Sequence, residues 1–305
     1  MRLPKLTISA QDAAGNPVGG LVVFLRDLMA SDTPGVGAVN RAVSFSASMK
    51  PTTTLEPGDW VAILTGPEGT ALAHLTIGSD DASLSLVAGK GGRMAGRVAF
   101  DSENSPPPYS TLTIGVRRTG ADAQLPAGPG FGSSPPSKVT ADGTFEIAGI
   151  LGSVEPHLVT PPRGWTLKSA THNGRDLLDA PADFKGGEQM MGVQLVITDR
   201  VSEITGTALD SRQQPAKGCS VVVYPEDRAS LLRQARWTRW ERADQNGRFH
   251  ASGLPAGRYL IVAIDRVDPS IWSTMEYLDR WRPSAARLTL ADGEKKTVTL
   301  ECVTP

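Results

Sequence analysis

The sequence is poor in the residues that most often carry chemistry. It holds two cysteines and four histidines in 305 residues. The histidines show neither metal-ligand spacing nor the HExxH arrangement of zinc peptidases; they are His74, His157, His172 and His250. No Gly-x-Ser-x-Gly elbow is present, and neither cysteine stands in the context of a thiol nucleophile. We therefore expect no enzyme activity, no catalytic residue, no metal site and no cofactor.

A surplus of charge and long apolar runs are lacking as well. The formal net charge is -1, whereas nucleic-acid binding needs a basic face. No stretch approaches the roughly 20 apolar residues of a membrane-spanning helix. Residues 1–6 lack the apolar region of a secretory signal, so an export signal would have to lie outside this chain. We expect no nucleic-acid partner and no membrane span.

The composition favours turns instead. The chain has 32 Gly and 23 Pro, and 6% of its residues are aromatic. Many tight turns with few long helices are typical of β proteins. Because one hydrophobic core rarely organises a chain of 305 residues, we expect two or three domains.

Repeated segments favour three domains. The opening strand MAGRVAFD of residues 94–101 recurs as ITGTALD in residues 204–210, and a weaker copy lies near residues 7–12. A repeat that is this widely spaced indicates tandem domains. The segments DGTFEIAGI (142–150) and NGRFHASGL (246–254) also correspond, and each predicts a hairpin whose turn glycine takes a positive φ.

Apolar β-branched runs close each repeat, at residues 82–87, 193–198 and 297–303. The predicted domains are therefore residues 1–89, 92–200 and 201–305. The first linker is rich in glycine, which predicts flexibility, whereas the second is so short that domains two and three should sit rigidly together.

Three segments interrupt the β pattern. Residues 227–240 predict a short helix or an ordered loop. Asp268 is a plausible N-cap of a short amphipathic helix that runs to about Arg280 and lies across a sheet face. Residues 121–138, rich in Gly, Pro and Ser, predict a long loop.

The two cysteines, Cys219 and Cys302, both fall in predicted strands of domain three. A bridge between them would close a long loop and stabilise the domain. Two buried thiols that act as small hydrophobic side chains are the interpretation we favour from the sequence.

Three motifs carry a family resemblance: the strand with Gly206, the turn DQNGRF (244–249) and the segment LPAGRY (254–259). Together they resemble the carboxypeptidase regulatory-like domain, a prealbumin-like family similar to collagen-adhesin B-type repeats and starch-binding-like sandwiches. The likeness is good over residues 201–305, fair over 92–200 and weak over 1–89. In domain two, EPHL (155–158) replaces the Gly-x-Tyr step, so this strand should start differently.

The expected fold is all-β: three tandem Ig-like or prealbumin-like β-sandwich domains, the third with a short helix. The resemblance implies an accessory module, common in exported bacterial proteins, for which carbohydrate binding is the usual activity. It brings no catalytic residues with it.

Aromatic residues gather in domain three beside several arginines. Such side chains can hold sugar rings or form protein interfaces; the candidate ligand-binding residues are Trp237, Trp240, Trp272, Tyr277, Trp281 and Arg239. The alternative, which we favour, is that the tryptophans pack the two non-β segments onto the sheet.

The leading functional hypothesis is a non-catalytic binding, adhesion or structural array, with a glycan or another cell-envelope protein as partner. One alternative is a purely structural spacer of a cell-envelope protein. Another is an accessory fragment of a hydrolase whose site lies between domains, which requires convergent titratable groups in a cleft. The expected location is secreted or cell envelope, with a cytoplasmic location left open.

Overall fold

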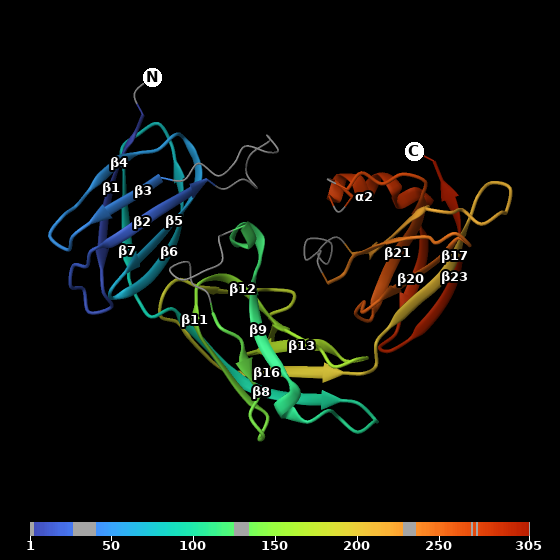
Figure 1. Cartoon of the computed structure of the whole chain (residues 1–305). Coiled ribbons are helices and arrows are strands. Elements are labelled where there is room, and N and C mark those ends of the chain that lie inside the picture. The colour runs from blue at the N-terminus through green and yellow to red at the C-terminus, as the bar shows by residue number, and fades with distance from the viewer. Residues whose placement is uncertain are drawn as a thin grey trace.

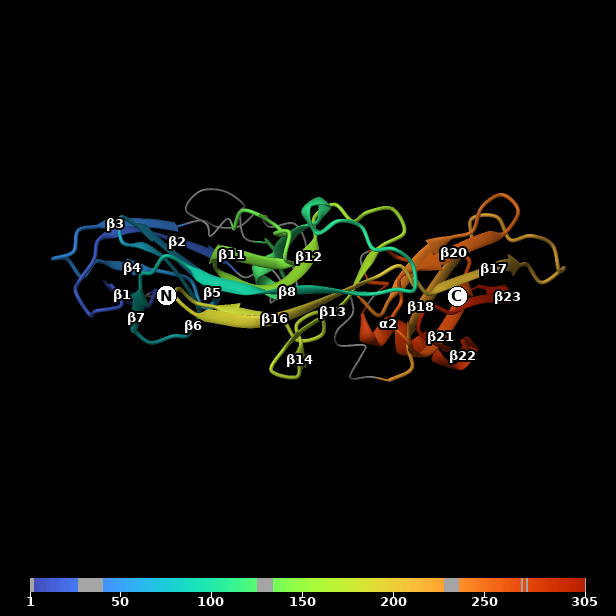
Figure 2. The same cartoon turned by 90° about the horizontal axis from the view of Figure 1, so that it is seen from below.

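Three β-sandwich units follow one another along the chain in the computed structural model (Figure 1). The structure describes residues 3–26, 41–124, 134–227, 236–269, 271–272 and 274–304. We call the three units unit one, unit two and unit three. In Figure 2 they form a row in chain order. The all-β fold expected from the turn-rich composition is confirmed.

Unit one places a sheet of order β4-β1-β7 against a sheet of order β3-β2-β5-β6. Alternation along β1 buries Leu6, Ile8 and Ala10 in the core that these sheets enclose. The strands are β1 Lys5–Gln11, β2 Gly20–Arg26, β3 Arg41–Phe45, β4 Thr52–Thr54, β5 Gly58–Gly66, β6 Gly69–Ile77 and β7 Ala82–Val87.

Unit two repeats this plan with an insertion. Its sheets have the orders β10-β9-β12-β15 and β11-β8-β16-β13-β14, and β13 and β14 are the inserted strands. The strands are β8 Gly92–Asp101, β9 Thr113–Arg118, β10 Ser137–Lys138, β11 Thr144–Ile150, β12 Gly152–Leu158, β13 Thr166–His172, β14 Arg175–Asp176, β15 Ala182–Phe184 and β16 Gln189–Thr198. Two short 3-10 helices are η2 Tyr109–Thr111 and η3 Gly120–Gln124. Of the long loop expected at 121–138, residues 125–133 lie outside the described residues.

Unit three joins its two halves through the last strand, which pairs with β17 along most of its length and with β21 at its end. The strand order is β19-β18-β21-β23-β17-β20, and β22 also pairs with β21. The elements are β17 Glu203–Leu209, β18 Ser220–Pro225, β19 Arg239–Arg242, β20 Arg248–Ser252, β21 Gly257–Ile264, α2 Met275–Trp281, η4 Arg282–Ser284, β22 Ala286–Leu290 and β23 Lys295–Val303.

The same pairing opens and closes every unit. The first strand is parallel to the last and antiparallel to the fourth, in the sets β1/β7/β4, β8/β16/β11 and β17/β23/β20. The repeated glycines belong to this arrangement, since a Cβ at Gly96 would lie 1.8 Å from the Val193 carbonyl oxygen and one at Gly206 would lie 2.2 Å from that of Val298. Three tandem units are therefore present, and the domain boundaries given above stay a prediction.

The turns predicted to form hairpins have the expected backbone but a different role. Gly143 and Gly247 take φ values of +82° and +71°. However, β10 pairs with β9 while β11 pairs with β8, and β19 pairs with β18 while β20 pairs with β17. The hairpin prediction is therefore wrong, because each turn carries the chain from one half of a sandwich to the other.

The predicted helix lies across the sheet but starts later than expected. Asp268 accepts a backbone hydrogen bond from Trp272 and closes a separate turn, whereas Thr274 caps α2 by accepting from the Tyr277 amide. The helix contacts the outer face of β18 and β21, where Tyr277, Leu278 and Trp281 are buried. Of the other non-β segment, residues 228–235 lie outside the described residues.

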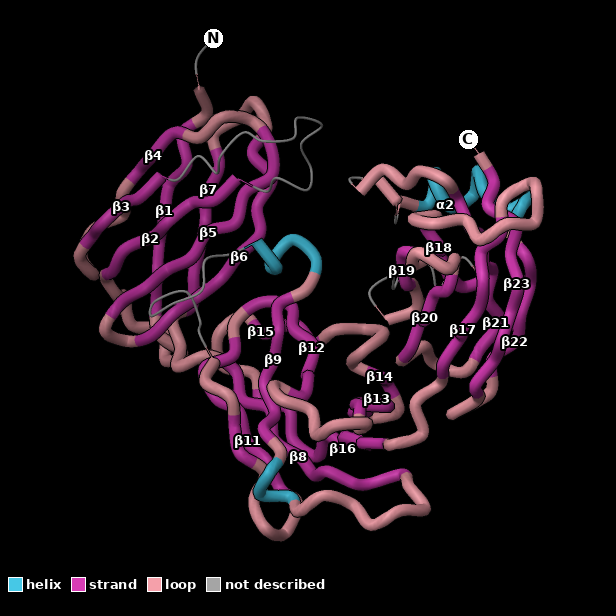
Figure 3. The backbone as a smooth tube through the Cα atoms, turned by 45° about the vertical axis from the view of Figure 1, so that its right-hand side comes forward, coloured by secondary structure: helices cyan, strands magenta, loops and turns pink. Residues whose placement is uncertain are grey.

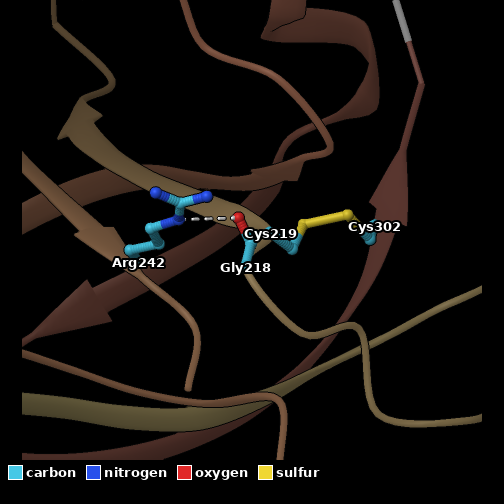
Figure 4. Close-up of a disulfide and its surroundings, with 4 residues drawn as sticks. All are labelled: Gly218, Cys219, Arg242 and Cys302. Carbon is cyan, nitrogen blue, oxygen red and sulfur yellow. Dashed lines mark hydrogen bonds between the residues drawn. A yellow bond between two sulfur atoms is a disulfide. The ribbon is translucent and has the colours of Figure 1, made fainter. Parts of the chain in front are cut away.

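The interpretation of Cys219 and Cys302 as free thiols is wrong, because the two form a disulfide (Figure 4). Cys219 directly precedes β18, and Cys302 pairs with Ala263 of β21, the neighbour of β18. Strand pairing brings the two Cα atoms to 6.3 Å, within the range that a disulfide spans. The sequence left this bridge as the less favoured alternative, because two cysteines 83 residues apart do not show which strands pair.

The glycine-rich first linker is an ordered contact and not the flexible tether that its composition predicts. Gly89 exchanges two backbone hydrogen bonds with Thr70, of 2.8 and 3.0 Å. A Cβ at Gly89 would lie 2.0 Å from the Gly186 carbonyl oxygen, and one at Gly69 would lie 2.0 Å from that of Gly89. These glycines permit close backbone contact between units one and two.

Candidate functional site

The predicted aromatic residues fall into two separate groups. Trp237 and Arg239 lie on the side of unit three that faces unit two, whereas the other four lie under and around α2. The sequence placed all six in one patch because two short segments supply them. They therefore do not form a single platform.

Trp237 and Arg239 have structural contacts. The Trp237 ring stacks on Tyr259 with centroids 6.1 Å apart, and its Nε1 donates to Asp179 of unit two at 2.8 Å. The Arg239 guanidinium donates to backbone carbonyls, among them those of Ser252 at 3.0 Å and Gly253 at 2.9 Å.

The second group is mainly a packing layer. Tyr277 and Trp281 are each 7% exposed, and Trp240 and Trp272 are half-buried with ring centroids 5.6 Å apart. The indole nitrogens of Trp240 and Trp281 are buried without a hydrogen-bond partner. This placement supports the packing interpretation. Trp272 is half-buried and follows the exposed Ile271 in the chain, so we call it the open edge of the group.

Polar contacts concentrate where units two and three meet. Arg236 of unit three pairs with Asp176 at 3.0 Å and Asp179 at 3.5 Å, and it donates to the Lys168 carbonyl. All three acceptors belong to the inserted hairpin of β13 and β14 or to the turn that follows it. The insertion that distinguishes unit two is thus the surface on which unit three sits.

A second network lies beside the short linker. Lys168 binds Asp101 at 2.6 Å and Asp292 of unit three at 2.5 Å. Arg200 binds Asp101 at 2.6 Å and Asp292 at 3.2 Å. The hydrogen bonds from Lys168 and then Arg200 lower the pKa of Asp101 despite some burial, so this carboxylate stays charged well into the acid range.

A cleft of about 240 Å³ opens next to Arg236 between the two units. Unit two supplies Arg117 from β9 together with Glu155 and His157 from β12, and unit three supplies Arg236, Arg239 and Gly253. Arg117 and Glu155 are direct partners across β9 and β12, and their side chains form an ion pair.

Two ionisable side chains of this cleft have buried polar atoms, while the Arg117 side chain is 61% exposed. Glu155 is 6% exposed, and the His157 Nδ1 atom is buried without a hydrogen-bond partner. Burial, and next to it the charge of Arg117, lower the pKa of His157 below its ordinary value, so its imidazole is neutral near pH 7.

Sequence reasoning did not identify this cleft. The one available signal was the segment EPHL, where charged and polar residues replace the expected Gly-x-Tyr step in a core strand. Because Glu155 and His157 are two positions apart on β12, their side chains share one face of the strand. The sequence pattern does not show that this face of the strand lies against unit three.

Units one and two meet through an apolar contact and a His–Asp pair. Leu151 of unit two is 1% exposed and packs against Val61, Ile63 and Leu72 on the outer face of unit one. The η3 segment reaches toward β6 in Figure 3, and His74 of β6 pairs with Asp122 of η3 at 3.0 Å.

Within the described residues, no group of three or more His, Cys, Asp and Glu side chains is placed to bind a metal ion. None of the helices in this part of the chain has the length and apolar character needed to cross a membrane.

Comparison with known proteins gives structural likeness alone. No family model and no curated protein match this chain, so the resemblance to the carboxypeptidase regulatory-like domain stays a prediction. A streptococcal ancillary pilin is 10% identical over 99% of each chain, with a TM-score of 0.27. The major pilin subunit BcpA of Bacillus cereus is 11% identical over 98% of this chain and 99% of its own, with a TM-score of 0.26.

The Bacillus anthracis TIE protein is 11% identical over 98% of this chain, with a TM-score of 0.24. This chain spans about half of that protein, since the match covers 50% of it. These similarities concern tandem β-sandwich architecture and carry no argument about function.

Proposed function

We propose that the chain is a non-catalytic structural or adhesive array that holds its second and third β units at a fixed angle. The observation that carries this proposal is the double polar contact between units two and three. Arg236 and Trp237 bind the inserted hairpin and its following turn on one side, and Lys168 and Arg200 bind Asp292 on the other. Contacts on two sides of a short linker oppose rotation about it.

The disulfide supports a location outside the cytoplasm, because such bonds persist in oxidising compartments. A secreted or cell-envelope location also agrees with a spacing or adhesive role. On the basis of the sequence motifs, we further propose that the array contains a carboxypeptidase regulatory-like module that recognises a glycan or an envelope protein.

The fixed angle is tested by small-angle X-ray scattering of the full chain and its Arg236→Ala variant. We expect the wild type to fit one arrangement of the units, and the variant to show a broader distribution of distances. Arg258→Ala is the matched control, since Arg258 is 74% exposed and pairs with Glu226 inside unit three. A variant profile identical to that of the wild type would refute a fixed angle set by this contact.

The aromatic group around α2 remains a proposed carbohydrate platform, supported by the half-buried Trp240–Trp272 pair at its open edge. A glycan array probed with the full chain and with Trp272→Ala tests it. Loss of array binding in the variant is the expected result, whereas unchanged binding would exclude Trp272 from the platform.

A further inference from the structure

Unit one has two free strand edges that lie next to each other. β6 is an outer strand of one of its sheets, and β7 is an outer strand of the other. The two strands follow each other in the chain and run in opposite directions. They meet at a bridge, where Thr70 and Gly89 exchange two backbone hydrogen bonds. Beyond this bridge the strands belong to different sheets, so within the described residues their facing edges form no ladder.

A groove of about 700 Å³ lies between the two edges. It is lined by residues 71–74 of β6, by residues 85–88 at the end of β7, and by residues 185–189 of unit two. Successive side chains of a strand point to opposite faces, so four successive residues line one groove only where it runs along the strand edge. Four residues of a strand span about 13 Å, which is room for a short extended segment.

On β7, the backbone groups of Ser85 and Val87 point into this groove. Ala88 donates its N–H to the Gln11 carbonyl of β1 at 2.8 Å, and β7 pairs with β1 in a regular parallel register. Successive residues of a strand direct their backbone groups to opposite sides, so Ser85 and Val87 face away from β1. Because β7 is an outer strand, these groups have no strand beside them in the described part of the chain.

On β6, the backbone of Leu72 has the matching direction. Thr70 faces away from β5, since it bonds to Gly89, and β6 pairs with β5 in an unbroken antiparallel register. Residues two apart in such a strand face the same side, so the N–H and C=O of Leu72 also point into the groove. The Leu72 side chain is 5% exposed and packs with Leu151 of unit two, which holds this edge in place.

The side chains along the groove are mostly small or apolar. They include four alanines, four glycines and Val87, which is 49% exposed. Small side chains let another backbone come within hydrogen-bond distance of the strand edges, and Val87 offers apolar contact to an incoming side chain. Unpaired strand edges of this kind are templates for an added strand, whose main chain supplies the hydrogen bonds.

Two lysines give the end of the groove beside unit two a charge preference. Lys90 is exposed and makes no ion pair with any described residue, and the Lys185 ammonium is 4.0 Å from its nearest carboxylate, Asp183. Glu188 lines the same end, but its Oε2 atom already accepts from the backbone amides of residues 185–187, each at 3.0 Å. An acidic group at this end of an occupant would therefore meet cations that lack a close partner.

We propose that this groove binds an extended peptide segment of another protein as an added strand between β6 and β7. The segment bonds to the outward backbone groups of Leu72, Ser85 and Val87, and it directs an acidic residue toward Lys90 and Lys185. It is parallel to one edge and antiparallel to the other, because the edges run in opposite directions. The proposal does not rest on the fixed angle between units two and three.

Calorimetric titration of the full chain with blocked synthetic hexapeptides tests the proposal. The probes alternate valine and serine and carry one aspartate at the first or the last position, because either strand direction satisfies the groove. We expect saturable binding of at least one of the two peptides. Lysine in place of the aspartate, or methylation of the inner amide nitrogens, should weaken binding by about tenfold or more, since the first reverses a charge and the second removes backbone donors.

Two variants locate the site, each with a matched control. Ser85→Pro removes an N–H that faces the groove and should weaken binding by about tenfold or more, since proline is tolerated on outer strands. Thr54→Pro removes an outward N–H of β4, at the opposite edge of the same sheet, and should leave binding unchanged. Lys90→Glu should reverse the preference for aspartate over lysine peptides, whereas Lys50→Glu, at an exposed position near β4, should keep it.

Hydrogen–deuterium exchange gives a direct readout. The amides of Leu72, Ser85 and Val87 should exchange more slowly when the peptide is bound, and circular dichroism with the melting temperature establishes that the variants are folded. The proposal is overturned if neither aspartate peptide binds, if the protected amides lie elsewhere, or if Ser85→Pro binds as the wild type does.

Sedimentation identifies a competing occupant. A wild type that is dimeric without peptide, and that Ser85→Pro makes monomeric, would place a second copy of the chain in the groove and would also overturn the proposal. A monomeric wild type supports it. Because the scattering experiment measures the angle between units two and three and not peptide binding, the two proposals can fail independently.

Discussion

At the scale of single residues, one turn recurs in the chain. An aspartate accepts backbone hydrogen bonds within this turn, and the residue three positions after the aspartate has a positive φ. Asp12, Asp210 and Asp244 each accept backbone hydrogen bonds from the residues two and four positions on. The residue three positions on has a positive φ, as seen for Gly15 (+87°), Gln213 (+61°) and Gly247 (+71°). Gln213 alone among these three carries a side chain in the left-handed region, which costs about 1–2 kcal/mol.

Gln213→Gly should therefore raise the free energy of unfolding. The relief of the left-handed strain exceeds the additional entropy of glycine in the unfolded chain, and we expect a net gain of about 0.5 kcal/mol. Urea unfolding followed by tryptophan fluorescence measures it. The reverse change, Gly247→Ala, should destabilise, because its Cβ would lie 2.5 Å from the Ala208 carbonyl oxygen. A lower midpoint for Gln213→Gly would contradict this explanation.

The disulfide gives a second prediction at this scale. Cys219 and Cys302 are 83 residues apart, and in the chain-entropy model such a crosslink stabilises a domain by about 4.5 kcal/mol. The Cys219→Ser/Cys302→Ser variant should thus unfold unit three at a much lower denaturant concentration. Calorimetry with and without reductant measures the effect. Reductant should not affect the double variant, and a wild type that is insensitive to reductant would count against a structural role.

At the scale of elements, η3 fixes a buried carboxylate against the neighbouring unit. Burial raises the pKa of Asp122, but hydrogen bonds from His74 and the Ser153 amide outweigh it and lower the pKa below the ordinary value. A carboxyl whose pKa is lower in the folded state stabilises the fold above its unfolded pKa of about 3.9. That stabilisation disappears as the pH falls through the folded pKa.

The free energy of unfolding should therefore fall as the pH drops below about 5, with Asp122 contributing to the slope. Asp122→Asn should be less stable than the wild type at pH 7 and should lose less stability on acidification. Denaturant titrations between neutral and strongly acid pH measure both. Asp183→Asn, at an exposed carboxylate whose nearest cation is 4.0 Å away, is the control. Parallel pH profiles for Asp122→Asn and the wild type would show that this ion pair contributes nothing.

The inserted hairpin of β13 and β14 is the element that decides how unit three is placed. It provides Lys168 and Asp176, and the turn after it provides Asp179. At the corresponding place unit three has α2 and η4 between β21 and β22, and in unit one β5 leads directly into β6. In the sequence this insertion looks like an ordinary turn-rich segment. Its role cannot be predicted there, because the side chain that it binds lies more than 50 residues away.

At the scale of the whole molecule, the two junctions differ in chemistry. Units two and three meet through ion pairs on two sides of a short linker. Units one and two meet through Leu151, one His–Asp pair and close glycine contacts. In Figure 1, units one and three rise from opposite ends of unit two, so each junction sets the direction of one arm.

The arms should consequently respond to separate mutations. Leu151→Ala removes apolar contacts with Val61, Ile63 and Leu72, at a cost of about 2 kcal/mol, and should loosen unit one alone. Arg236→Ala should loosen unit three alone. Distances between paired spin labels on neighbouring units, measured by electron paramagnetic resonance, distinguish the two. A broadened distribution at both junctions from either change would contradict this and show that the two junctions are coupled.

Much of the architecture could be predicted from the sequence by itself. Strands place apolar side chains on one face, which appears in the sequence as an alternation with period 2. Turns with a positive φ and close backbone contacts favour glycine, so their positions are also visible in the sequence. These two local patterns, with the repeats, predicted the all-β fold, the number of units and the closing strands, and a separate amphipathic pattern predicted a helix near α2. The glycines of the first linker misled the prediction, because flexibility and close packing select the same residue.

Only the tertiary structure decided which distant side chains meet. The Cys219–Cys302 bond, the Glu155–His157 cleft and the contact of Arg236 with Asp176 all depend on pairing between segments that are separate in the chain. Local propensity carries no information about such contacts, since the same residues would have the same preferences beside any neighbour. The sequence by itself thus determined the three sandwiches, and the packing between strands and units determined the crosslink, the junctions and the cleft.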